Sequence, residues 1–126
     1  MNNMVFPGML ERFFSYVKVD TQSSEDSTGF PSSQKQLNLL NQLKSELEEL
    51  GLEEVTITQW GYVLGTLKTN QDKEVPAIAL IGHVDTSPDV SGENVKPQVH
   101  QNYDGKDIVL SPESGVVIKV EDNPYL

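Results

Sequence analysis

The stretch Val75–Asp89 constrains the fold of this chain more than any other. It contains an uninterrupted apolar run, Ala77–Ile81, which is too short to span a membrane and has proline before it and glycine after it. Such a run, bounded by residues that favour turns, is typical of a β-strand buried on both faces. The sequence therefore predicts a sheet whose two faces are covered by other elements.

Two chemically active residues, His83 and Asp85, follow this run. If the strand continues, both side chains point to the same side, because side chains alternate along a strand with a period of two. In sheets covered by helices, functional groups collect at the carboxyl ends of strands. The pair is thus a candidate half of an active site. The spacing alone also fits a strand end at which both side chains only satisfy backbone groups, since His-x-Asp occurs by chance.

Composition excludes several classes of protein. The 126 residues fit one domain, 1–126, and 37% hydrophobic with 22% charged residues is ordinary for a globular chain. A formal charge of −10 disfavours nucleic acid and anionic membranes as partners. Without cysteine, a metal site has to use histidine and carboxylates. No signal segment and no run of about 20 apolar residues is present, so we expect a cytoplasmic protein with no membrane partner.

Helices are predicted before the apolar run. Apolar residues at helical spacing predict a helix over Phe6–Val17 that packs on the core, and the polar segment Lys18–Pro31 is expected to be an exposed loop. Ser33 and Gln36 form a capping-box pair, and the leucine stripe that follows predicts a core-packed helix ending at Gly51.

Strands are predicted on both sides of the apolar run. Alternation over residues 55–58 and 62–67 predicts a hairpin that turns at Gly61, and short strands are expected at 108–110 and 116–120. A long loop, 86–97, lies between the apolar run and the last strands. The predicted fold class is α/β, a mixed sheet with helices packed on it.

Other catalytic chemistries lack their motifs. The chain contains no Gly-x-Ser-x-Gly elbow and no glycine-rich phosphate-binding loop. The second histidine, His100, lies in a polar stretch and is expected on the surface. Asp89 follows Pro88 and is expected in a turn.

The segment Ile81–Asp89, Ile-Gly-His-Val-Asp-Thr-Ser-Pro-Asp, resembles the first metal motif of the peptidase T family. These tripeptide aminopeptidases are co-catalytic dizinc metallopeptidases related to aminoacylases and carboxypeptidases. Further similar segments follow the family's order along the chain: 10–13, Val19-Asp20-Thr21-Gln22-Ser23, Pro31-Ser32, 47–52, Asn102-Tyr103 and Asp107-Ile108.

The resemblance implies roles for the candidate pair. His83 would be a ligand to one of two zinc ions, and Asp85 a catalytic-site carboxylate that orients His83. The zinc pair would activate water for attack on short peptides, mainly tripeptides, with a glutamate as general base. The remaining ligands, that glutamate and the lid or dimerisation domain correspond to positions beyond Leu126.

The resemblance also implies an incomplete protein. We expect the N-terminal part of a catalytic domain, inactive by itself and prone to self-association through exposed surfaces. The alternatives are a non-catalytic binding or assembly module, or a related dipeptidase, carboxypeptidase or deacylase.

Overall fold

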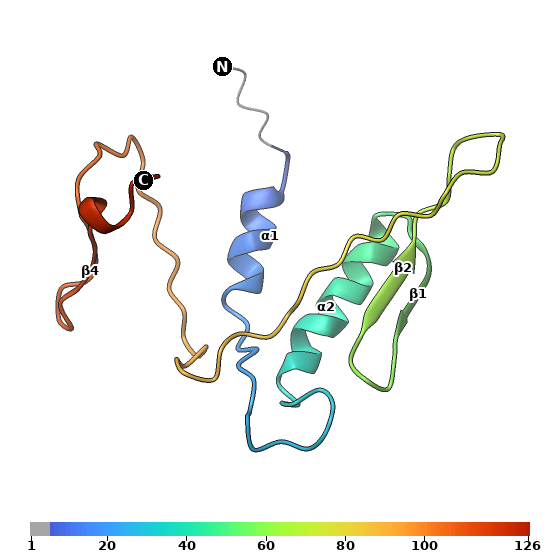
Figure 1. Cartoon of the computed structure of the whole chain (residues 1–126), viewed down its shortest axis with the longest axis horizontal. Coiled ribbons are helices and arrows are strands. Elements are labelled where there is room, and N and C mark those ends of the chain that lie inside the picture. Colours follow the sequence, from blue (N-terminus) through green and yellow to red (C-terminus); the bar gives the residue numbers. More distant parts are fainter. Residues whose placement is uncertain (1–5) are drawn as a thin grey trace.

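The structure, a computed structural model, describes residues 6–126 (Figure 1). Residues 1–5, where a signal segment would begin, lie outside the described residues. The elements in chain order are α1 (Met9–Tyr16), α2 (Gln36–Glu49), β1 (Glu53–Ile57), β2 (Val63–Thr66), β3 (Ile108–Ser111), β4 (Val116–Ile118) and the short 3-10 helix η1 (Val120–Asp122). Helices and small antiparallel sheets together give the chain the α/β character predicted from its sequence.

Helix α2 and the β1–β2 hairpin form the packed part of the chain. The hairpin is antiparallel, as predicted, and lies beside α2 in Figure 1. Leu39 and Leu40 on α2 are only 7% and 3% exposed. Burying such side chains contributes roughly 1.5–3 kcal/mol each. The predicted leucine stripe is confirmed in part: Leu40 belongs to it, whereas Leu39 does not. Its other members are half-buried or, at the end of the helix, exposed: Leu37, Leu43, Leu47 and Leu50.

The end of α2 follows the sequence prediction. Gly51 has φ +82, which is the left-handed conformation that glycine adopts without steric cost. Its N–H donates to the carbonyl of Glu48 (3.0 Å), and the N–H of Leu52 donates to the carbonyl of Leu47 (3.0 Å). This pair of bonds is a Schellman motif, which satisfies carbonyls that the helix itself leaves free.

The start of α2 differs from the prediction, because the capping box does not form. Gln36 is the first helical residue, and the preceding residue, Lys35, makes no side-chain capping bond. The Gln36 N–H donates to the backbone carbonyl of Ser33 (3.2 Å), and its side chain donates to the hydroxyl of Ser32 (3.2 Å). A tight turn therefore replaces the predicted cap.

Helix α1 confirms the predicted helix, but the prediction that it packs on the core is wrong. None of its residues is buried, and Met9 and Phe13 are more than half exposed. It contacts α2 through polar groups instead: the Tyr16 hydroxyl donates to Glu46, and Gln42 on α2 donates to the hydroxyl of Ser15 (2.9 Å). Within residues 6–126 no element covers the apolar side of α1.

The predicted buried strand at Ala77–Ile81 is wrong. The segment is extended but pairs with no strand among the described residues, and Ile78, Leu80 and Ile81 are 87%, 96% and 94% exposed. A buried strand needs neighbours on both edges and cover on both faces. The described residues provide neither.

The sheet also differs from the prediction. In place of one mixed sheet, residues 6–126 form separate two-stranded antiparallel sheets, β1–β2 and β3–β4. The predicted strands near the C-terminus are confirmed as β3 and β4, which lie apart from the helices in Figure 1. None of the helices in the described part of the chain combines the length and the apolar character that a bilayer span requires.

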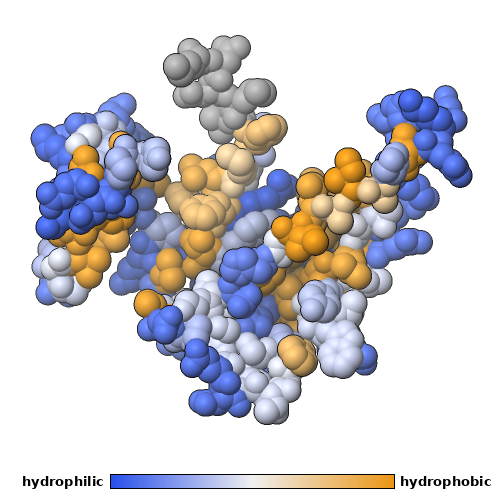
Figure 2. Space-filling view, in the orientation of Figure 1, coloured by the Kyte–Doolittle hydropathy of each residue, from blue (hydrophilic) through white to orange (hydrophobic). Residues whose placement is uncertain are grey.

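The chain exposes far more surface than its size requires. Its accessible area is 10766 Å², whereas a compact protein of 14.0 kDa exposes about 6,700 Å². Figure 2 shows that much of the apolar surface lies over α1 and along the extended segment that crosses α2. The excess, about 4,000 Å², is surface that a compact arrangement of this length would cover.

Candidate functional site

The structure brings together the two residues that the sequence singled out. His83 Nδ1 lies 3.3 Å from Asp85 Oδ1, and the two side chains are 85% and 52% exposed. Although the predicted sheet is missing, the backbone here is still extended, so side chains two residues apart fall on the same side. The contact therefore follows from local geometry alone.

This geometry suits one metal ligand with its orienting carboxylate. When Nδ1 carries the imidazole proton, it donates to Asp85 and leaves the Nε2 lone pair for a metal ion, which is the usual arrangement at zinc sites. A zinc site needs about three protein ligands. Within residues 6–126, no group of three or more histidine, cysteine, aspartate or glutamate side chains lies close enough to hold a metal. The pair thus fits part of a site.

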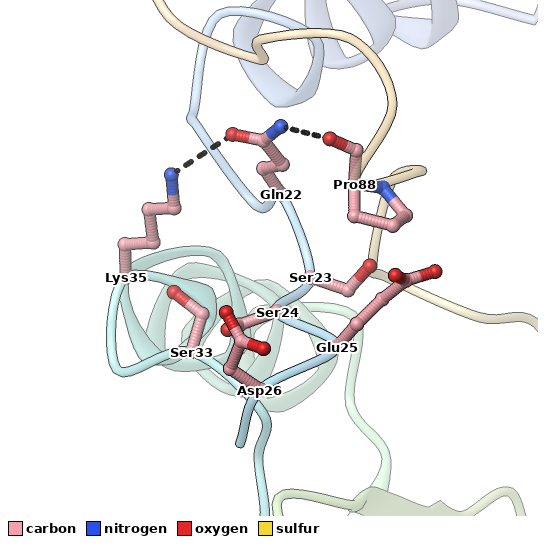
Figure 3. Close-up of a pocket in the computed structure, with 8 residues that line it drawn as sticks. All are labelled: Gln22, Ser23, Ser24, Glu25, Asp26, Ser33, Lys35 and Pro88. Carbon is pink, nitrogen blue, oxygen red and sulfur yellow. Dashed lines mark hydrogen bonds between the residues drawn. The ribbon is translucent and has the colours of Figure 1, made fainter.

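The segment after the pair is held by the polar stretch 20–23. The Thr86 N–H donates to the Thr21 carbonyl (3.2 Å), and the Ser23 N–H donates to the Thr86 carbonyl (3.0 Å), in a parallel bridge between Gln22 and Thr86. The Gln22 side-chain amide also donates to the Pro88 carbonyl (2.8 Å; Figure 3). We call residues 20–23 the clamp.

An ion pair shapes the clamp. Asp20 Oδ1 accepts the Gln22 N–H (3.0 Å), and its other carboxylate oxygen accepts a hydrogen bond from Lys35 Nζ (2.6 Å). The Lys35 ammonium, with help from the Gln22 N–H, holds the pKa of Asp20 below its usual value. Lys35 also reaches the side-chain oxygen of Gln22 at 3.5 Å, as Figure 3 shows.

Sequence reasoning missed the clamp. The segment 18–31 was predicted to be an exposed loop, but Thr21 within it is only 3% exposed. Its polar composition gave no periodic pattern, and the partners that it holds next to the candidate pair, Thr86 and Pro88, lie more than 60 residues further along the chain. The only clue in the sequence was the resemblance of residues 19–23 to the peptidase T family.

Grooves lie on both sides of the segment that carries His83. One, of about 540 Å³, is bounded by Phe13, Tyr16, the clamp residue Thr21 and α2. The other, of about 600 Å³, is bounded by α2, by residues 60–64 of the hairpin and by residues 80–85. A smaller polar hollow of about 380 Å³ lies beside the clamp (Figure 3). The candidate pair is therefore beside concave surface.

The other sequence candidates lie where they were expected. His100 is exposed. Asp89 lies in a turn, where its N–H donates to the Ser87 hydroxyl (3.2 Å) and its carboxylate accepts from the same hydroxyl (2.7 Å). Neither residue joins the His83–Asp85 pair.

No family model matches the chain, but individual proteins resemble it closely. It is 52% identical over 118 residues to the protein named Peptidase T of Listeria welshimeri, and 49% identical over 118 residues to Peptidase T of Clostridium botulinum strain Langeland. Each alignment covers 94% of this chain and 29% of the relative. The chain thus spans less than a third of the length of these relatives, and the resemblance seen in the sequence is confirmed.

Proposed function

We propose that this chain supplies the first metal-binding motif of a zinc-dependent aminopeptidase that removes the N-terminal residue from tripeptides. The similarity to proteins named Peptidase T over 94% of the chain supports the peptidase class. The single observation that carries the proposal is the contact of His83 with Asp85, which gives the imidazole a defined orientation.

In this proposal each residue has a distinct task. His83 would hold zinc through Nε2, and Asp85 accepts a hydrogen bond from Nδ1–H, which fixes the tautomer and raises the basicity of the ring. The clamp fixes the backbone just after the pair through Thr86. A bound zinc ion would lower the pKa of a water molecule and polarise the peptide carbonyl.

The described residues provide a partial site, so we further propose that the chain alone does not hydrolyse peptides. Turnover of a tripeptide by the purified, zinc-loaded chain would overturn this part of the proposal. A non-catalytic binding or assembly module is the alternative, and it predicts no zinc binding that depends on His83.

Zinc titration by calorimetry tests the role of His83. The wild-type chain should bind zinc weakly, His83→Ala should abolish that binding, and Asp85→Asn should weaken it. His100→Ala is the matched control, because it removes the chain's other histidine from an exposed position away from the pair. Equal zinc binding by wild type and His83→Ala would exclude the proposed ligand.

A chimera tests the function. The 118-residue match allows the corresponding part of the Listeria welshimeri protein to be replaced by this chain. The chimera should cleave a tripeptide, and His83→Ala in the chimera should remove that activity. A chimera that is folded and binds zinc but is inactive would contradict the proposed role of this chain.

A further inference from the structure

The segment that carries the candidate pair is connected to the packed part of the chain through the clamp. The backbone groups of residues 75–82 form no hydrogen bond with other described residues. Within residues 6–126, every hydrogen bond that joins residues 83–97 to residues 6–74 has a clamp residue as its partner. The bonds of the clamp therefore hold the candidate site in place.

The clamp holds the chain after Asp85 at two points. The Thr86 backbone is bonded through both its N–H and its carbonyl, and the Pro88 carbonyl accepts a hydrogen bond from Gln22 Nε2 (2.8 Å). The proline ring fixes φ at Pro88 and restricts Ser87, which precedes it, to extended conformations. Few torsions are free between the two points, so holding both of them fixes the direction in which the backbone leaves Asp85.

Lys35 orients the amide of Gln22. Its ammonium group, which can only donate, lies 3.5 Å from Gln22 Oε1 and is kept there by its 2.6 Å bond to Asp20. If the amide were reversed, its NH2 group would face the ammonium and its oxygen would face the Pro88 carbonyl oxygen. Donors would then face donors, and acceptors would face acceptors. The ammonium therefore favours the orientation in Figure 3, in which Nε2 faces Pro88.

The same contacts connect the candidate site to the core. Lys35 immediately precedes α2, the helix that carries the buried side chains Leu39 and Leu40. The Asp20 side chain is only 17% exposed, and Gln22 is half-buried. Water competes less for hydrogen bonds in such a place than on an open surface, so these bonds are stronger than exposed ones.

We propose that Gln22 is a positioning residue of the candidate site, oriented by Lys35 and acting on the site through the Pro88 carbonyl. By holding the backbone that follows Asp85, it keeps the Asp85 carboxylate against the His83 ring. This role rests on the proposed function, in which His83 and Asp85 form part of a zinc site.

Gln22→Glu tests the role with almost no change of shape. The carboxylate can still accept a hydrogen bond from Lys35, but it has no N–H to donate to the Pro88 carbonyl. Amide hydrogen exchange at Thr86, followed by NMR, should become about two- to tenfold faster, which corresponds to the loss of one hydrogen bond. Gln98→Glu is the matched control, because Gln98 makes the same kind of bond to the Leu110 carbonyl (2.9 Å). It should leave Thr86 exchange unchanged.

The exchange of Leu40 in α2 separates a local effect from general unfolding. In Gln22→Glu the Leu40 N–H should exchange at the wild-type rate, because the substitution leaves the contact with Lys35 in place. An unchanged rate at Thr86 would overturn the proposal. Equal acceleration at Thr86 and Leu40 would also overturn it, since Gln22 would then stabilise the whole fold and not the site.

Substitutions of Lys35 test the orientation of the amide. Lys35→Met removes the ammonium, so it should also speed exchange at Thr86. Lys35→Arg keeps a cation that can only donate, and it should restore the wild-type rate. Equal rates in these two variants would show that Lys35 does not orient Gln22.

Zinc calorimetry distinguishes this role from the proposed function. If zinc binding depends on His83, Gln22→Glu should lower the zinc affinity by about the same factor as it speeds Thr86 exchange. Binding that His83→Ala abolishes but Gln22→Glu leaves unchanged would overturn the positioning role and retain the proposed function. Faster Thr86 exchange in Gln22→Glu, without zinc binding by wild type, would support the hold on the backbone and contradict the metal function.

Discussion

The substitution Gly92→Ala probes how closely the clamp and the loop after the candidate site approach each other. A Cβ at residue 92 would lie 2.7 Å from Asp20 Oδ1 and 3.5 Å from Thr86 Oγ1. The Asp20 carboxylate cannot simply rotate away, because it accepts hydrogen bonds from the Gln22 N–H and from Lys35. The added methyl group therefore has to displace the loop or break these bonds.

We expect Gly92→Ala to lower the free energy of unfolding by about 1–3 kcal/mol, the usual cost of inserting a methyl group into a closely packed place. For a chain of this length, each kcal/mol lowers Tm by about 4 °C. Thermal unfolding followed by circular dichroism measures the change. Gly82→Ala is the matched control, because a Cβ there meets nothing within 4 Å, and we expect its stability to equal or slightly exceed that of wild type.

A double-mutant cycle identifies the cause. In an Asp20→Ala background the clashing carboxylate is absent, so Gly92→Ala should add almost no further loss of stability. The reasoning is refuted if Gly92→Ala is as stable as wild type. It is equally refuted if the substitution costs as much without the Asp20 carboxylate as with it.

Two further predictions concern the end of α2 and the contact of α1 with α2. Gly51→Ala should lower the free energy of unfolding by about 1–2 kcal/mol, because φ is +82 there, whereas Gly29→Ala, without a positive φ, should be near neutral in the same thermal melts. Burial and the hydrogen bond to Glu46 raise the pKa of Tyr16 to about 12. Since the unfolded chain loses this proton at about pH 10, stability should fall as the pH rises from about 10 to 12. Tyr16→Phe should remove that fall, as read from tyrosinate absorbance and alkaline unfolding; an unchanged slope would contradict it.

The local elements of this fold could be predicted from the sequence because their signals are local. The period of the leucines, the glycine at residue 51 and the alternation in the hairpin each act over a few residues. The contact between His83 and Asp85 belongs to the same class, since an extended backbone brings the two side chains together with or without a sheet.

Features that depend on distant partners could not be predicted in this way. Apolar composition predicted a buried strand at Ala77–Ile81, but a strand depends on pairing with neighbours, which the described residues do not supply. The clamp could not be predicted for a related reason. Polar residues such as Gln22 show no periodic pattern, and they bond to residues far along the chain. Their role follows from the backbone hydrogen bonds between this stretch and Thr86.

The bridge between Gln22 and Thr86 has a consequence for the order of folding. It joins residues more than 60 positions apart, and closing a loop of that length costs about 4 kcal/mol of chain entropy. Helix α2 and the hairpin need only short loops, so they can form first and bring the ends of the long loop closer. The segment that carries His83 therefore reaches its place late in folding, and a slow folding phase should report its arrival.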